Sequence, residues 1–164
     1  MKYLFQDWSV NERNIKGRLV MLMFRFAHIA TFNIAFFFLW IPYLVLYRVL
    51  IEWFLGIELP YKLNIGKNLT LYHGQALVIN DGTKIGKNCT LRHSTTIGNK
   101  RNKDGTYTTC PVLGDNVQLG SNVCIIGPIT IGDNVIVGAG SVVVKSVLQN
   151  CVIAGNPARI IATI

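Results

Sequence analysis

Hydrophobic and polar positions follow two different patterns on either side of Gly56. Before Gly56 the chain is rich in aromatic and aliphatic residues and poor in glycine. After it, glycine and β-branched residues alternate with Asn and Asp, which favour turns. The change predicts an N-terminal helical segment, residues 1–57, followed by a β-structured domain, residues 58–164.

A six-residue period runs through the second part of the chain. In LGDNVQ, LGSNVC, IIGPIT, IGDNVI and VGAGSV, glycine follows the aliphatic residue in four of five units. Each unit supplies one short strand with its aliphatic side chain pointing inward, and three units close one triangular coil. Twelve units predict a parallel β-helix of about four coils. The aliphatic positions are Ile65, Leu71, Ile79, Ile85, Leu91, Ile97, Leu113, Leu119, Ile125, Ile131, Val137 and Val143.

Two interruptions of the period mark the candidate site. Two residues are inserted between Leu71 and Ile79, in LYHGQALV, and they place His73 where the surface of the β-helix is disturbed. Between Ile97 and Leu113 the spacing is sixteen residues instead of six. The extra residues, within GNKRNKDGTYTTCP, are polar and are expected to loop out. Insertions in repeat proteins gather on the binding face.

Composition narrows the classes of function. The chain is 51% hydrophobic with 15% charged residues, so a folded protein is expected. Its formal net charge is +8, but the basic residues are scattered and form no arginine-rich arm or aromatic-interleaved RNA motif. No nucleic acid partner is therefore expected, and a phosphate-bearing cofactor fits the charge better.

Cysteines and the N-terminus indicate the compartment. The four cysteines show no CxxC spacing and are interpreted as reduced thiols, three of them packing as small hydrophobes among aliphatic residues. The start of the chain, MKYLFQDWSVNERN, lacks the basic and then apolar order of a secretory signal. A cytoplasmic location is expected, with peripheral contact at the inner face of the membrane as an additional option.

These motifs resemble a known family. The run from Gly56 to Arg159 resembles the serine acetyltransferase branch of the hexapeptide-repeat acyltransferases, and most closely its exopolysaccharide members of the colanic acid type. The N-terminal helices resemble that subgroup too. The resemblance implies an all-β fold, a left-handed parallel β-helix with a short N-terminal α-helical segment. It also implies acetyl-CoA as co-substrate, a homotrimer and a site between subunits.

The resemblance also implies the catalytic residues. LYHGQAL places His73 on the general base of the family, and imidazole, with a pKa near ~6.5, suits this role at neutral pH. Glu58 lies where the family carries Asp and would fix the tautomer of His73. Glu58 could equally be a surface acid that caps the start of the β-helix. His28, in an apolar segment, is interpreted as a packing residue.

Two departures from the family concern the acceptor. Tyr72 replaces the acceptor-binding acid, and Cys110, in TCPV, replaces a His that follows the looped-out segment. Both departures favour a hydroxyl of a sugar or polysaccharide precursor over L-serine, with serine O-acetylation as the alternative. His93 lies one coil after His73 and is a candidate for the same acceptor pocket. Cys110 is interpreted as shaping that pocket rather than as an acyl-accepting nucleophile.

Coenzyme residues follow from the same resemblance. Ser121 and Ala139 match small residues that contact the coenzyme, and Lys145 and Arg159 are candidates for its phosphates. The basic loop residues, Lys100, Arg101 and Lys103, either are solvated or attract an anionic ligand.

The run Phe26–Tyr47 has no charged residue over 22 positions, about the ~20 residues that span a bilayer. Its polar residues oppose a span, and a break at Pro42 predicts two shorter helices. These helices would pack on the trimer or lie on a membrane surface.

Two further functions remain open. A zinc-dependent carbonic anhydrase can be built on this scaffold, but catalytic zinc usually has three protein ligands, and only His73 and His93 lie in the repeats. No metal is expected. A non-catalytic membrane-attached scaffold is the other alternative.

Overall fold

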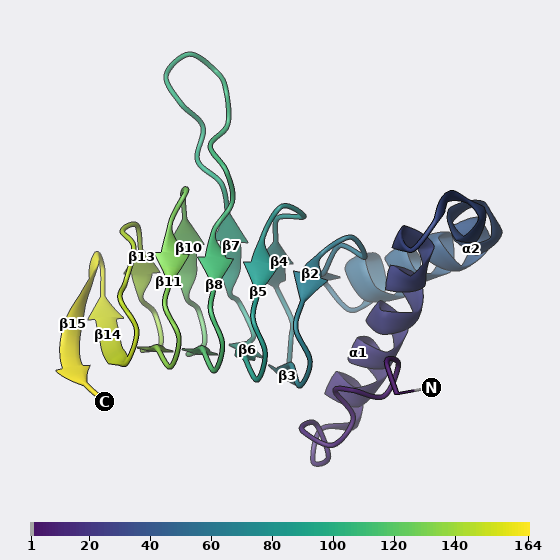
Figure 1. Cartoon of the computed structure of the whole chain (residues 1–164), viewed down its shortest axis with the longest axis horizontal. Coiled ribbons are helices and arrows are strands. Elements are labelled where there is room, and N and C mark those ends of the chain that lie inside the picture. The colour runs from purple at the N-terminus through teal and green to yellow at the C-terminus, as the bar shows by residue number, and fades with distance from the viewer. Residues whose placement is uncertain (1) are drawn as a thin grey trace.

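Short parallel strands coil around one long axis, with two helices at one end of the molecule (Figure 1). The computed structural model describes residues 2–164, apart from the side chain of Phe36. The helical part consists of α1 (Ile15–His28), a 3-10 turn η1 (Ile29–Thr31), α2 (Ile34–Tyr47) and a π-helix η2 (Arg48–Phe54).

The strands form three sheets, one for each side of the triangular coil. The first sheet contains β1 (Ile57–Glu58), β4 (Leu77–Ile79), β7 (Thr96–Gly98), β10 (Cys124–Ile126) and β13 (Val142–Val143). The second contains β2 (Asn64–Ile65), β5 (Lys84–Ile85), β8 (Val112–Leu113) and β11 (Thr130–Ile131). The third contains β3 (Thr70–Tyr72), β6 (Thr90–Arg92), β9 (Gln118–Leu119), β12 (Ile136–Val137), β14 (Cys151–Gly155) and the antiparallel β15 (Ala158–Thr163).

The predicted β-helix is confirmed, but it has about five coils rather than four. The first sheet has five strands, one for each coil. The hexapeptide count missed β1 and β14, because their inward residues, Ile57 and Ile153, lie outside the regular repeat and are buried by neighbouring coils.

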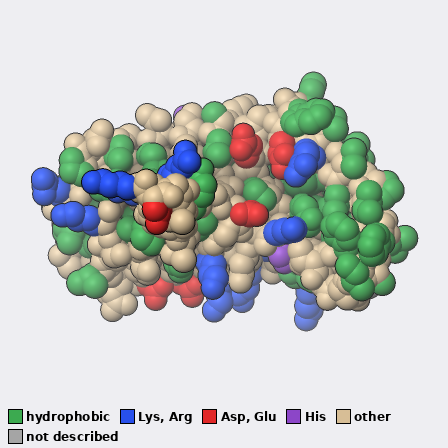
Figure 2. All heavy atoms as spheres, turned by 90° about the horizontal axis from the view of Figure 1, so that it is seen from above, with side chains coloured by type: hydrophobic (Ala, Val, Ile, Leu, Met, Phe, Trp, Pro, Cys, Tyr) green, Lys and Arg blue, Asp and Glu red, His purple; other side chains and the backbone are tan. Residues whose placement is uncertain are grey.

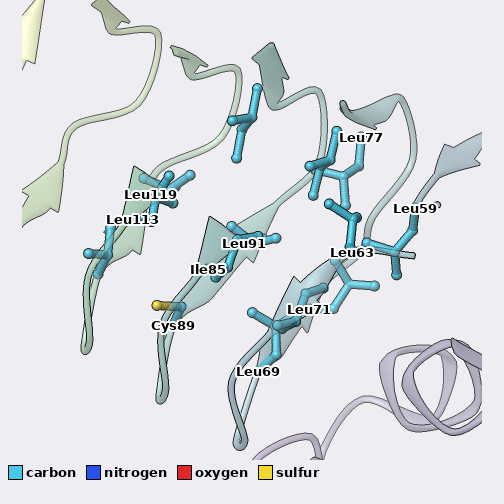
Figure 3. Packing of buried hydrophobic residues seen from close by; sticks show 14 of the residues in the cluster. Leu59, Leu63, Leu69, Leu71, Leu77, Ile85, Cys89, Leu91, Leu113 and Leu119 are labelled. Carbon is cyan, nitrogen blue, oxygen red and sulfur yellow. The ribbon is translucent and has the colours of Figure 1, made fainter. Parts of the chain in front are cut away.

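The core confirms the predicted periodicity. All twelve aliphatic positions of the repeat are buried, and repeat residues pair with repeat residues in adjacent coils, as Ile79 does with Ile97. The position two residues earlier in each unit also points inward, as Leu69, Cys89 and Val117 do. Figure 3 shows members of this core, among them Leu69, Cys89 and Leu91, inside the coils. Each six-residue unit therefore buries two side chains, which is why the pattern is so regular.

One edge of the β-helix is built from a column of asparagines. Between the second and third sheets, Asn68, Asn88, Asn116, Asn134 and Asn150 all have φ between 56° and 62°. Each side-chain amide donates to the side-chain oxygen of the next asparagine over 2.7–2.9 Å. Asparagine tolerates this left-handed conformation better than most residues. We call this edge the asparagine corner.

Side chains of the N-terminal segment close the first coil. The backbone N–H groups of Leu69 and Leu71 donate to the side chains of Asp7 and Asn11, and Asn11 also donates to the carbonyl of Leu69. These groups would otherwise be left unpaired at the end of the third sheet. The segment therefore takes the place of a preceding coil.

Arg25 completes this closure. Its guanidinium donates to the carbonyls of Ile65 and Gly66 and pairs with Asp7, with Nε 2.7 Å from Oδ2. Both side chains of this ion pair are only 2% exposed. The helical segment and the β-helix accordingly share one core.

The predicted helix break at Pro42 is wrong. The chain breaks instead at η1, and α2 continues through Pro42. The indole of Trp40 donates to the carbonyl of Phe26, and the hydroxyl of Tyr43 donates to that of Met23, both over 3.0 Å. These contacts hold α2 against α1 on both sides of the proline, which offsets its cost of ~3 kcal/mol in a helix interior.

Candidate active site

The edge between the third and first sheets carries most of the predicted site. Its turns contain Ala76, Ser94, Asn122 and Gly140, which all have positive φ and follow one another in successive coils. Backbone hydrogen bonds join these coils, from Ser94 N to Gln75 O, from Asn122 N to His93 O and from Gly140 N to Ser121 O. We call this edge, with the side chains that precede these turn residues, the histidine corner.

His73 lies in the first turn of the histidine corner. The two-residue insertion widens this turn, and His73 itself has φ 66° and an exposed side chain. Histidine is one of the few residues enriched in this left-handed region. The centroid of its ring lies 5.7 Å from that of His93, with the two planes at 72°. The structure therefore brings the predicted base and His93 together.

His93 provides a polar atom that lacks a partner. Its Nδ1 is buried, and within residues 2–164 it forms no hydrogen bond. A buried polar nitrogen without a partner is uncommon and costs free energy. Beside it the Arg92 guanidinium lies over the ring of Tyr72, 5.0 Å from the centroid. An imidazole, a cation and an aromatic ring therefore lie side by side at this corner.

A shallow groove leads from these side chains along the third sheet. It is lined by Arg92, Gly120, Ser121, Gly138 and Ala139, among others. A Cβ on Gly120 would lie 2.5 Å from the backbone nitrogen of Ala139, so only glycine fits there. The predicted coenzyme residues Ser121 and Ala139 thus share a groove with Arg92. Their contact with the coenzyme stays a prediction.

Glu58 is not joined to His73 in this chain. It is the last residue of β1, opposite Val78 of β4, and its side chain is exposed. Within residues 2–164 the Glu58 carboxylate forms no hydrogen bond or ion pair with His73. Its proposed role in orienting the imidazole stays a prediction.

Cys110 lies at a different edge from His73. It follows the looped-out segment between the first and second sheets, and its thiol donates to the side-chain oxygen of Asn80 over 3.0 Å. Burial, and to a smaller extent the charge of Asp81, raise the pKa of the Cys110 thiol. A nucleophilic cysteine needs the opposite shift, so the environment disfavours an acyl-enzyme at Cys110.

The other predicted residues lie outside the groove. Lys145 follows β13 at the same edge as Cys110, and Arg159 lies on the terminal strand β15, both with exposed side chains. The looped-out segment projects away from the coils (Figure 1) and is held by an antiparallel bridge between Arg101 and Tyr107. Within one chain, Cys110, Lys145 and Arg159 therefore lie away from the histidine corner.

Sequence reasoning missed Arg92. The residue sits at the end of β6, directly before His93, and pairs in register with Tyr72 of β3. Its position in the hexapeptide unit is that of Gly120 and Gly138 in later coils, and this departure from glycine was the available signal.

Comparisons with known proteins agree with this architecture. Residues 110–145 match the model of the bacterial transferase hexapeptide family (six repeats). The soybean serine acetyltransferase apoenzyme superposes with a TM-score of 0.80 at 26% identity, covering 98% of this chain and 68% of that one. The serine acetyltransferase of Brucella abortus in complex with coenzyme A, at 24% identity and a TM-score of 0.78, has the same fold over 98% of this chain and 67% of its own.

Sequence relatives define the family. Serine acetyltransferase 4 of Arabidopsis thaliana is 38% identical over 106 residues, which is 65% of this chain and 29% of that protein. WcaB of Escherichia coli K12, which is named as a colanic acid biosynthesis acetyltransferase, is 40% identical over 161 residues, covering 96% of this chain and 98% of WcaB. The chain therefore belongs to the hexapeptide-repeat acetyltransferases, in the group that includes WcaB.

Proposed function

We propose that the protein transfers acetyl from acetyl-CoA to a hydroxyl of a sugar or polysaccharide precursor in exopolysaccharide or capsule biosynthesis. The similarity to WcaB carries this proposal, because it extends over 96% of the chain and includes the helical segment. The similarity to serine acetyltransferase 4 covers only 65%.

His73 acts as the general base in this proposal. Its imidazole accepts the proton of the acceptor hydroxyl as the oxygen attacks the acetyl carbonyl of the thioester. A C–O bond forms, the C–S bond breaks, and the proton passes from His73 to the departing thiolate. The exposed side chain of His73, beside the ring of His93, supports this role.

Acceptor recognition falls to the neighbours of His73. His93 lies beside His73, with the ring centroids 5.7 Å apart, and Tyr72 carries an aromatic ring that a sugar could stack on. The Arg92 guanidinium above that ring would attract an anionic acceptor. The chemistry of this pocket suits a carbohydrate.

The coenzyme would lie in the groove along the third sheet. Gly120 and Gly138 let successive coils pack closely along this groove, and Ser121 and Ala139 are small enough to let a pantetheine chain approach the backbone. Lys145 and Arg159 are the proposed partners of its phosphates, as exposed cations near the C-terminal coils.

We further propose a homotrimer with the site between subunits. The first sheet separates Cys110 from His73 within one chain, so a site that uses both groups needs two chains. The edge with Cys110, Lys145 and the looped-out segment would then face the histidine corner of a neighbour. Sedimentation equilibrium tests this assembly, and a monomer would contradict it.

Serine O-acetylation is the second candidate, favoured by the serine acetyltransferase relatives. Tyr72 in place of an acid and Cys110 in place of a His oppose it. Thiol release from acetyl-CoA, with L-serine compared against sugars, sugar nucleotides and oligosaccharides, separates the two. Turnover with carbohydrate alone is expected; turnover with serine alone would overturn the proposal.

A further inference from the structure

An apolar surface covers the outer side of α2 and η2. Phe38, Leu39, Val45, Trp53 and Phe54 are between 60% and 82% exposed. Figure 2 shows hydrophobic side chains gathered at the end of the molecule that the helices form, whereas charged and polar side chains are interspersed along the rest of the face. We call these five side chains and their apolar neighbours the helical apolar surface. Exposed patches of this kind mark binding sites.

Two grooves extend this surface. One, between α1 and η2, is lined almost entirely by apolar side chains, including Ile15, Leu19 and Phe54. The other runs along α2 and η2 and includes Phe37, Ile41 and Trp53. Exposed apolar side chains therefore line both sides of η2. A single partner helix in one groove would leave the other groove exposed.

The charges around the surface are predominantly positive. Between Glu12 and Glu52 the sequence contains five Lys or Arg residues and no acid. Two of the five are neutralised, because Arg25 is buried against Asp7 and Arg48 pairs with Glu52. The remaining three are Arg13, Lys16 and Arg18. Lys16 lines the first groove and Arg48 the second, where Glu52 pairs with Arg48. A second copy of this chain would bring the same cations against one another. Anionic lipid headgroups, in contrast, complement them.

The inner side of the same helix is tied to the protein. The Tyr47 hydroxyl donates to the carbonyl of Leu59 over 2.7 Å, and Tyr47 and Ile51 are each only 1% exposed. Trp40 and Tyr43 hold α2 to α1. The stretch Phe37–Phe54 is long and apolar enough to cross a membrane. If this helix crossed a bilayer, however, lipid would surround it, and its contacts with α1 and with Leu59 would be lost.

We propose that the helical apolar surface docks on the surface of an anionic lipid bilayer, with α2 and η2 lying in the interface. Aromatic side chains such as Trp53 and Phe54 would enter the headgroup region, and Lys16 would contact anionic headgroups. Docking holds the first coil, which carries His73, next to the membrane. This inference does not depend on the identity of the acetyl acceptor.

Vesicle co-sedimentation of the full chain tests the docking. The protein is expected to bind phosphatidylcholine vesicles that contain roughly one-quarter phosphatidylglycerol at least ~10-fold more tightly than phosphatidylcholine alone. The double variant W53S/F54S should lose about 10-fold in binding or more, because it removes two aromatic side chains from the interface. Equal binding of the variant, or no binding of the unaltered protein, would overturn the proposal.

A matched control lies at the other end of the molecule. Leu148 and Ile161 are 81% and 65% exposed, so L148S/I161S removes similar apolar area there and should leave vesicle binding unchanged. Sedimentation velocity and thermal unfolding of both variants exclude a loss of fold. A lower assembly mass for W53S/F54S would assign the surface to contact between copies. Resistance of the bound protein to alkaline carbonate would indicate a spanning helix; either result overturns the proposal.

Discussion

The asparagine corner and the histidine corner use the same backbone geometry for different purposes. At both edges the turn residue of each coil has a positive φ. The asparagine corner places the same residue in five successive coils and joins them by side-chain hydrogen bonds. The histidine corner uses Ala76, Ser94, Asn122 and Gly140 at the corresponding turns and adds an inserted His73.

This difference indicates that the two corners have different roles, one in stability and one in chemistry. In the asparagine corner the side-chain amides form hydrogen bonds with one another, since each amide lies next to an identical amide in the adjacent coil. At the histidine corner the column is varied, the Nδ1 of His93 has no partner, and a groove opens beside it. We therefore propose that the asparagine corner supports the structure and that the histidine corner contacts the substrate.

The largest expected effect is on catalysis at the histidine corner. His73→Asn keeps a residue that tolerates φ near +66° but removes the base, so we expect kcat to fall by ~10²- to 10⁴-fold. Acetyl-CoA turnover measures this, and an unchanged melting temperature confirms that the fold is kept. Activity near that of the unaltered protein would remove His73 from the mechanism.

The next effect is on the support of the first coil, where the asparagine corner begins. Arg25→Met leaves the buried Asp7 carboxylate without its cation and the carbonyls of Ile65 and Gly66 without donors. We expect a loss of ~3–5 kcal/mol in the free energy of unfolding, measured in urea. The double variant D7N/R25M should recover part of it, and a loss below ~1 kcal/mol in R25M would contradict the role of this pair.

Within the asparagine corner a single substitution should cost less. Asn116→Ala places alanine at φ 60° and removes two hydrogen bonds of the column, so we expect ~1–3 kcal/mol of destabilisation with unchanged kcat. Asn116→Gly keeps the backbone unstrained and isolates the hydrogen-bond contribution. A large loss of kcat in a well-folded Asn116 variant would break the division between the two corners.

The smallest effect is expected at Cys110. Because burial raises the pKa of its thiol, Cys110→Ser should change kcat by less than about threefold. Mass spectrometry of the protein after mixing with acetyl-CoA should find no acetyl group on Cys110. Acetylated Cys110, together with inactive C110S, would instead establish an acyl-enzyme.

Much of the β-helix could be predicted from spacing. The inward positions repeat every six residues, because each short strand must bury its aliphatic side chain in the same core. Strands β1 and β14 were missed, since the repeat weakens where the coil meets the helices or ends. His73 was predicted from its insertion together with the resemblance to the family, and His93, Ser121 and Ala139 do share one edge with it.

The positions of Glu58 and Cys110 relative to His73 could not be predicted from spacing. The spacing of a residue along the chain places it on a coil, but it does not determine which side chains meet across an edge. Glu58 forms no bond with His73 in residues 2–164, and Cys110 lies across the first sheet from it. In the proposed trimer, these groups would join the site only through contacts with another chain.

The sequence by itself determined the coil, its inward residues and the position of the candidate base, because these follow from a local repeat and its interruptions. Only the tertiary structure decided how the first coil ends, through Asp7, Asn11 and Arg25, and where the helices break. Those contacts join residues about 40 to 62 positions apart. A periodic pattern in the sequence cannot predict these contacts, because each one depends on a single side chain that reaches a single unpaired backbone group.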